Sequence, residues 1–159
     1  MDKKTVNLAI ELHGHLAPGI ALGLRMSELA LSRLNAKKGD KHLIGISETA
    51  RCLADAMQAA TGCTLGHGNA CVEDYGKLAI TIGDVRTKKG VRVALKDAQL
   101  LTLDSSYFLI QNVEIKKNQS FEKSDIVRCT KCNELIPQSL LITGKDYCKA
   151  CGDRSYYEL

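Results

Sequence analysis

Residues 13–25 read HGHLAPGIALGLR, and the predicted fold follows from the helix that starts within this stretch. Pro18 suits the first turn of a helix, where its missing backbone N–H is not needed, so a helix is expected from this residue onward. His13 and His15 share a side if the residues before Pro18 are extended, because side chains alternate along a strand. Two imidazoles beside a helix N-terminus suit a metal ion or an anion. The alternative is that both rings only cap backbone groups at the helix entry.

The elements predicted around this helix mix helices with strands. Helices are expected over 5–13, from 18 toward Gly39 and over 51–60, and strands over 42–47, 70–76, 77–82 and 91–95. Apolar residues at helical spacing, from Ile20 to Leu34, define the long helix. Residues 97–128 are ambiguous, and a helix over 104–111 is one interpretation of them. This order predicts an α+β core in which the helices cover one face of a small mixed sheet.

The composition is that of an ordinary globular protein. The chain has 159 residues, of which 45% are hydrophobic and 25% charged, enough for one core domain and a small appendage. No apolar run approaches the roughly 18 residues of a membrane-spanning helix, so no membrane contact is expected. The N-terminal apolar region is too short for a signal peptide, which predicts a cytoplasmic location. A polar stretch at 116–124 is the expected linker, giving domains 1–120 and 121–159.

The net charge of +4 comes from one segment of the chain. Residues 86–128 contain nine basic and five acidic side chains, whereas the segments before and after them are balanced. A basic segment of this kind could meet nucleic acid or an anionic ligand. Aromatic residues, which stack on bases, are only 4% of the chain, so nucleic acid is weakly supported and a solvated face is the preferred interpretation.

Two Cys-x-x-Cys pairs near the C-terminus form the most specific motif. In a reducing cytoplasm, seven cysteines indicate metal ligation rather than disulfides. Two residues between cysteines let a turn present both sulfurs to one tetrahedral ion, which predicts a structural zinc finger. The expected ligands are Cys129, Cys132, Cys148 and Cys151. A left-handed backbone is expected after each pair, at Asn133 and Gly152. A redox pair of dithiols is the alternative.

Three further cysteines lie in the predicted core. Cys71 falls in a strand-like run and is interpreted as a small buried apolar residue. Cys52 starts a helix, where the helix dipole favours a thiolate. Cys63 lies in a glycine-rich loop, and with Cys52, His13 and His15 it would supply the imidazole and thiolate ligands that suit zinc or another late transition metal. The alternative is a set of core cysteines and capping histidines.

The stretch HGHLAPGIALGLR, together with residues 52–69 (CLADAMQAATGCTLGHGN) and 74–77 (DYGK), resembles the FmdE family, which is named after a component of formylmethanofuran dehydrogenase. The resemblance runs from about residue 8 to 95, and the zinc module is similar to that of two-domain members. It implies an α+β core, a homodimer, a pocket lined by cysteine and histidine, and a context of molybdenum or tungsten enzymes of one-carbon metabolism, as in methanogenesis. The family pattern carries a cysteine after HGHx, where this chain has Ala17.

The resemblance carries four residues over as a core metal site: His13, His15, Cys52 and Cys63. Cys52 and His15 are the catalytic candidates, although the resemblance does not decide whether the chain is an enzyme or an accessory subunit of a formylmethanofuran dehydrogenase-type oxidoreductase. Contacts to a small anionic or pterin-like ligand are expected from Thr61, Thr64, Asn69 and Lys77. The expected function is thus metal binding linked to molybdenum- or tungsten-dependent one-carbon metabolism, in complex with such an enzyme. The alternative is a regulatory or metal-sensing protein whose zinc finger binds protein or nucleic acid.

Overall fold

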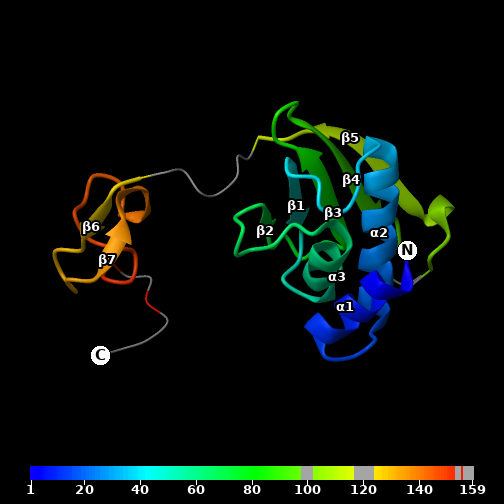
Figure 1. Cartoon of the computed structure of the whole chain (residues 1–159), viewed down its shortest axis with the longest axis horizontal. Helices are drawn as coiled ribbons and strands as arrows, with labels where there is room; N and C mark the ends of the chain where they lie inside the picture. Colours follow the sequence, from blue (N-terminus) through cyan, green and yellow to red (C-terminus); the bar gives the residue numbers. More distant parts are fainter. Residues whose placement is uncertain (98–101, 117–123, 153–154, 156–159) are drawn as a thin grey trace. The chain divides into compact units, whose positions relative to one another are not determined.

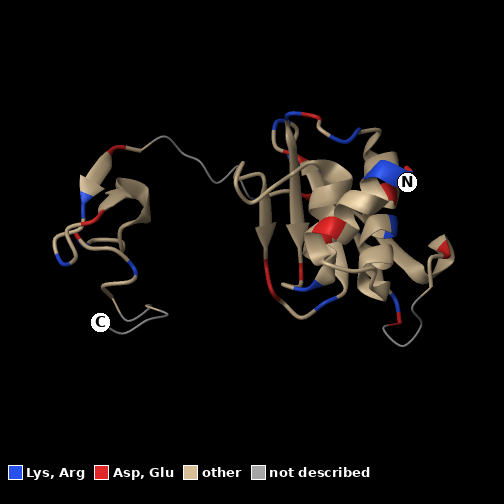
Figure 2. Cartoon of the chain, turned by 60° about the horizontal axis from the view of Figure 1, so that its bottom comes forward, with Lys and Arg blue, Asp and Glu red and all other residues tan. Residues whose placement is uncertain are grey.

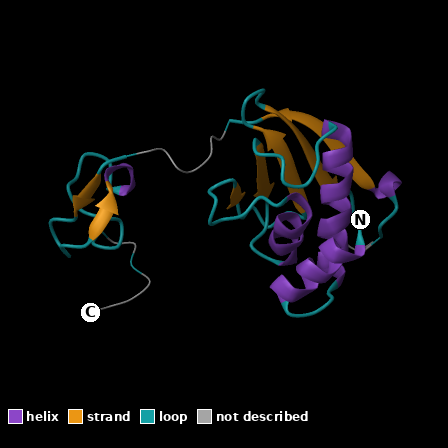
Figure 3. Cartoon of the chain, viewed as in Figure 1, coloured by secondary structure: helices purple, strands orange, loops and turns teal. Residues whose placement is uncertain are grey.

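Helices α2 and α3 cover one face of a five-stranded sheet, and helix α1 packs against α3 (Figures 1 and 3). The helices are α1 (Lys3–His13), α2 (Pro18–Leu34) and α3 (Cys52–Thr61). The strands are β1 (Leu43–Ser47), β2 (Ala70–Val72), β3 (Ala79–Asp84), β4 (Lys89–Leu95) and β5 (Phe108–Glu114). In the order β2-β1-β3-β4-β5, β1 and β2 are parallel and the other neighbours antiparallel. The predicted α+β class with a small mixed sheet is confirmed.

The computed structural model describes residues 1–97, 102–116, 124–152 and 155. The chain divides into two compact units, Met1–Ser120 and Phe121–Leu159. The predicted domain boundary, between 120 and 121, lies outside the described residues. Across the described ranges, no helix is both long and apolar enough to cross a bilayer.

Helix α2 begins where the proline pattern predicts. Pro18 occupies the first turn, and Ala17 before it is extended and makes no side-chain cap. The helix ends at Leu34 because Asn35 takes the left-handed conformation (φ 52°), and the carbonyl oxygens of the last turn accept its N–H. The stop predicted at Gly39 therefore falls a few residues too late.

Two glycines let α2 and α3 approach closely. A Cβ atom on Gly23 would lie 2.6 Å from the Cβ of Ala56, and one on Gly19 would lie 2.8 Å from the Cβ of Cys52. Neither approach leaves room for a side chain, because real Cβ contacts are longer. The glycines of the opening stretch thus place the N-terminus of α3, with Cys52, directly against the N-terminus of α2.

Residues 104–111, for which a helix was one interpretation, form a short turn and the start of a strand instead. A single 3₁₀ turn at Ser105–Tyr107 is followed by β5, which pairs with β4 from Phe108 opposite Leu95 onward. Phe108 is buried in the core, while Ile110 on the same edge strand is 38% exposed. Pairing with β4 decides the outcome, since a short apolar run fits a helix or a strand equally well by pattern alone.

The face of the sheet opposite the helices carries an ion pair. The strand register places Ile46, Thr81, Arg92 and Gln111 in one row across this face. The Arg92 guanidinium donates hydrogen bonds of 2.6 and 2.8 Å to the two carboxylate oxygens of Glu48, which is buried. The hydrogen bond from Arg92 lowers the pKa of Glu48 below its ordinary value of 4.5.

Replacing Glu48 by glutamine tests this pair. Because the pKa of Glu48 is lower in the folded than in the unfolded chain, its ionised form stabilises the fold above pH 4.5, and this contribution is lost as the pH falls below that value. We expect Glu48→Gln to lower the free energy of unfolding by about 1–2 kcal/mol at pH 7 and by much less at pH 3. Denaturant unfolding at both pH values measures the difference. The exposed Glu11→Gln variant is the control, and a loss that does not change with pH would contradict the assignment.

The second unit contains a small hairpin of two strands. Strands β6 (Ile126–Arg128) and β7 (Leu135–Pro137) pair antiparallel, and a 3₁₀ turn, η2 (Gln138–Leu140), follows. Among the described residues of this unit, the buried hydrophobic side chains are Cys129 and Cys148. The interior of the unit is therefore built from its cysteines rather than from an apolar core.

Candidate metal centres

The four cysteines of the second unit converge on one point. One Sγ atom from each of them lies within 4.8 Å of all the others. The Sγ–Sγ distance is 3.8 Å between Cys129 and Cys151 and 4.0 Å between Cys132 and Cys148. A tetrahedral zinc ion with bonds of about 2.3 Å to sulfur requires sulfur–sulfur distances of about 3.8 Å. The cluster can therefore hold a metal ion such as zinc.

Each cysteine pair lies in a tight turn. The backbone N–H of Asn133 donates to the carbonyl of Cys129 at 2.9 Å, and Asn133 takes the predicted left-handed conformation (φ 63°). Gly152 N–H donates to the carbonyl of Cys148 at 3.2 Å, but the left-handed conformation predicted there is wrong. A Cβ atom at Gly152 would meet the end of the Ile142 side chain, so glycine lets that side chain pack against the turn.

Hydrogen bonds and crowding shift the pKa values of Cys129 and Cys151 in opposite directions. Backbone N–H groups, first that of Cys132 and then that of Cys148, lower the pKa of Cys129 to about 6. The hydrogen bond with Cys148, burial and the neighbouring sulfurs raise the pKa of Cys151 to about 12. Four adjacent thiolates repel one another, and a bound cation removes that penalty. A divalent cation bound between the four sulfurs would therefore stabilise this arrangement.

A histidine–carboxylate pair lies at the N-terminus of α3 in the first unit. Nδ1 of His13 is 2.9 Å from Oδ2 of Asp55, and both side chains are half-buried. Cys52 lies one turn before Asp55 on the same helix and packs against Gly19. A carboxylate on Nδ1 leaves Nε2 of the imidazole available, which is how many metal-binding histidines are oriented.

The second histidine of the opening stretch lies beside the first. The ring centroids of His13 and His15 are 5.0 Å apart. The segment is not extended, because His13 ends α1 and Gly14 takes the left-handed conformation (φ 89°). The chain turn at Gly14, rather than strand alternation, therefore brings the two rings together. His15 is exposed, whereas His13 is held by Asp55.

Cys63 lies away from this group. It is 1% exposed and packs in the apolar core between the helices and the sheet, and burial raises the pKa of its thiol. The ten residues of α3, about 15 Å of helix, separate it from the end that carries Cys52. The structure thus brings His13, His15 and Cys52 to one end of α3 but not Cys63. Within the described residues, the four C-terminal cysteines are the group that gathers three or more ligand atoms.

The predicted cofactor residues divide between two places. Thr61 and Asn69 line a cavity of about 440 Å³ together with His67. Thr64 lies in the same loop, where its hydroxyl is 3.0 Å from Nδ1 of His67 and its N–H donates to Asn69 Oδ1 at 2.9 Å. These hydrogen bonds lie within the glycine-rich loop and stabilise its conformation. Lys77 lies elsewhere, with its ammonium 5.6 Å from the centre of the Tyr75 ring.

Two residues beside Cys52 were not predicted from the sequence to take part in the site. Asp55 is three positions after Cys52, which puts both on one face of α3, and that spacing was the available signal. Gly19 follows Pro18 directly, and its requirement for close helix packing is visible only in three dimensions. Both residues position the side chains predicted to bind a metal.

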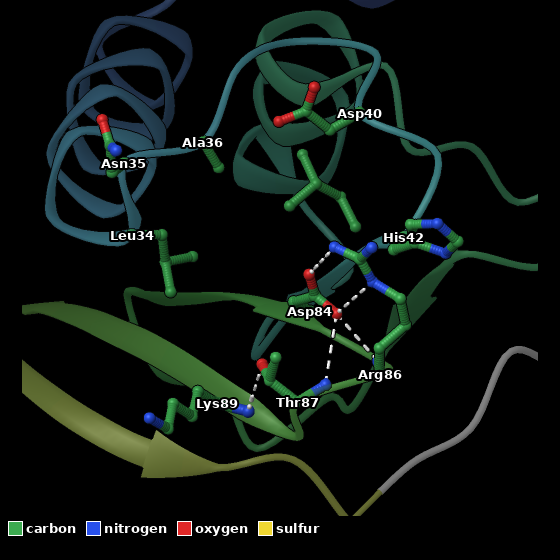
Figure 4. A pocket seen from close by; sticks show the side chains of 10 residues that line it. Leu34, Asn35, Ala36, Asp40, His42, Asp84, Arg86, Thr87 and Lys89 are labelled. Carbon is green, nitrogen blue, oxygen red and sulfur yellow. Dashed lines mark hydrogen bonds and ion pairs between the residues drawn. The ribbon is translucent and has the colours of Figure 1, made fainter.

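Among the described residues of the first unit, the basic side chains of segment 86–128 do not gather on one surface. Figure 2 shows Lys and Arg interspersed with Asp and Glu on the first unit. Arg92 pairs with Glu48 across the sheet, whereas Arg86 lies on the turn between β3 and β4 and Lys89 begins β4 (Figure 4). Lys117 and Lys123 fall outside the described residues. This distribution gives no continuous track for a nucleic-acid backbone among the described residues.

Comparison with known proteins finds similarity to a family model, to solved structures and to a curated relative. A family model described as "FmdE, Molybdenum formylmethanofuran dehydrogenase operon" matches residues 12–136. The crystal structure of a tungsten formylmethanofuran dehydrogenase FmdE-like protein from Syntrophus aciditrophicus is similar with a TM-score of 0.74 and 29% identity, over 96% of this chain and 92% of that one. A probable S-adenosyl-L-methionine-binding protein of Archaeoglobus fulgidus is 42% identical over 90 residues, which are 54% of this chain. The matched region is 25% of that relative's length.

Proposed function

Because the chain belongs to the FmdE family, we propose that it is a metal-binding protein with two centres, one in each unit. The four cysteines of the second unit hold zinc in a structural role. His13, His15 and Cys52 of the first unit hold a second transition-metal ion. The observation that carries the second assignment is the 2.9 Å contact between His13 Nδ1 and Asp55 beside Cys52.

The chemistry of the first-unit group suits a metal of the zinc or late transition series. Asp55 orients the His13 ring and fixes its tautomer, which leaves Nε2 free to act as a ligand. His15 supplies a second imidazole and Cys52 a thiolate, so the protein offers three ligands of the soft and intermediate kind. Ala17 leaves a fourth position without a protein sulfur, and a site with three protein ligands keeps a position open for water or substrate.

The family supports a place in molybdenum- or tungsten-dependent one-carbon metabolism. Its model is described by a molybdenum formylmethanofuran dehydrogenase operon, and the Syntrophus protein is described as like a component of the tungsten enzyme. We infer that this chain acts as an accessory protein of such an enzyme in the cytoplasm. Four of its seven cysteines have the spacing of metal ligands, which supports a reducing compartment.

Metal content tests the two-centre proposal. We expect two metal ions per chain in the intact protein and one in Cys52→Ser, because the serine hydroxyl is a poor ligand for these metals. Asp55→Asn keeps the shape of the carboxylate and should weaken binding of the core metal about 10–100-fold, since the amide orients the imidazole less well. Plasma mass spectrometry and competition with a chromogenic chelator measure both. Cys71→Ser, in strand β2, is the matched control and should retain two ions. One ion per chain in both the intact protein and Cys52→Ser would contradict the proposal.

A regulatory role of the second unit is the alternative function. Its hairpin exposes Ile126 (60%) and Leu135 (63%), and the register places both on one face with Pro137. Exposed apolar side chains of this kind favour a protein partner over nucleic acid. The equal numbers of basic and acidic residues from 129 to 159 also count against nucleic acid.

A further inference from the structure

Strand β5 is one edge of the five-stranded sheet, and among the described residues no strand pairs with its outer side (Figure 1). It pairs with β4 over its whole length, from Phe108 to Glu114, without a bulge. Sheet edges are usually protected from pairing with another chain by shortness, bulges, prolines or lysines. The other edge, β2, is protected by its length of three residues. The seven residues of β5 include no proline and no lysine, so this edge is unprotected.

The hydrogen bonds to β4 determine which backbone groups of β5 point outward. Directly after β5, the N–H of Ile115 donates to the carbonyl of Lys88 at 2.7 Å. Residues two positions apart in a strand point the same way, so the residues of β5 that bond to β4 are Leu109, Gln111 and Val113. The N–H and C=O groups of Ile110 and Asn112 therefore point away from the sheet. Within the described ranges, no hydrogen bond engages them.

Exposed apolar side chains gather along this edge. Four large hydrophobic side chains between positions 103 and 110 are exposed: Leu103, Tyr107, Leu109 and Ile110. The charged side chain of the strand is Glu114, which lies at its end and opposite Lys89 of β4. A long apolar edge with open backbone groups favours contact with another strand over contact with water.

We propose that β5 pairs with β5 of a second copy of this chain, antiparallel about a two-fold axis at Gln111. In this register the two strands overlap over their full length. Ile110 of each copy lies opposite Asn112 of the other, and the outward N–H and C=O groups of these residues bond to one another. The same surface thus complements itself, as the interface of a two-fold dimer requires, and the two sheets become one.

The side chains fit this register as well as the backbone does. Leu109 of each copy lies opposite Val113 of the other, on the sheet face away from the helices, where an apolar pair stabilises strand pairing. Glu114 lies opposite Phe108 of the second copy rather than opposite another carboxylate, so no like charges meet. An unrelated strand would have to match both the apolar side chains and the position of the charge. The interface does not involve the proposed metal centres.

Sedimentation of the metal-loaded full chain tests the interface. We expect a dimer at about 0.1 mM. Asn112→Pro should raise the dissociation constant about hundredfold or more, because it removes an outward N–H from both copies. The bonds to β4 remain, since proline is tolerated where the N–H of an edge strand faces solvent. Asn112→Ala is the matched control: it removes the same side chain but keeps the N–H, and the dimer should remain.

Hydrogen exchange of single amides identifies the surface. In the dimer the amide of Ile110 should exchange slowly, and in Asn112→Pro it should exchange fast, whereas the amide of Gln111, which bonds to β4, should be slow in both. Leu109→Lys, a second variant, should also dissociate the dimer. Leu65→Lys changes an equally exposed leucine of the glycine-rich loop and should not. A monomer at 0.1 mM, fast exchange of Ile110 in a dimer, or a dimer that persists in Asn112→Pro and Leu109→Lys would each overturn the proposal.

Discussion

Removing the metal from the second unit is expected to unfold that unit and leave the first unit folded. The described part of the second unit buries Cys129 and Cys148 and no larger apolar side chain. Its hairpin has two strands of three residues each, and an isolated hairpin of this size is marginal in water. Structural zinc contributes on the order of 10–16 kcal/mol to folding in comparable peptides. That contribution far exceeds what the hairpin can supply alone.

Nuclear magnetic resonance of the full chain can follow the two units separately. After treatment with a strong chelator, the amide signals of residues 124–152 should collapse into the range typical of unfolded chains, while those of the sheet stay dispersed. Cys148→Ser should give the same spectrum without chelator, because the buried Cys148 is both a candidate ligand and part of the small interior. Lys145→Ala, at an exposed position of the same unit, should leave the spectrum and the metal content unchanged. A dispersed spectrum of the metal-free second unit would refute a structural metal.

The sequence predicts the local features of this chain well. The cysteine cluster follows from ligand spacing, because two residues between cysteines fix a turn whatever surrounds it. The start of α2 follows from Pro18, whose preference is also local. The conformation of residues 104–111 is harder to predict from sequence. It depends on pairing with β4, which lies more than ten residues earlier in the chain.

The candidate site of the first unit shows where local reasoning ends. Cys52 and Cys63 flank the same helix, and their types alone suggest shared ligation, but α3 carries them to opposite ends. Asp55 is recognisable as a neighbour of Cys52, yet its partner His13 is 42 positions earlier in the chain. Only the packing of α1 against α3 shows that the two meet. The close packing of α2 against α3 likewise becomes visible only in three dimensions.

Substituting Gly23 by alanine is expected to lower the free energy of unfolding of the first unit by about 2–3 kcal/mol. Alanine is more favourable than glycine in a helix by about 1 kcal/mol. The steric cost of the new Cβ atom therefore has to exceed this gain before the free energy of unfolding falls. The new Cβ would lie 2.6 Å from the Cβ of Ala56 and 3.2 Å from the Cα of Leu53, and backbone atoms cannot turn aside as a flexible side chain can. Gly66→Ala is the control, because a Cβ atom there meets nothing within 4 Å. Denaturant unfolding should find that control within about 0.5 kcal/mol of the unchanged chain.

A double-mutant cycle decides whether the contact with Ala56 is the cause. If it is, Gly23→Ala should cost less in the Ala56→Gly background, because the opposing Cβ is gone, and the two changes will not add. Additive losses would place the strain elsewhere, such as at Leu53. The same spacing positions the candidate metal ligands, since Gly19 sits one helical turn before Gly23 and packs on Cys52. Gly23→Ala should therefore also weaken binding of the core metal while leaving the second-unit metal in place. A loss of the core metal alone would show that the glycines of residues 13–25 position the metal ligands as well as the helices.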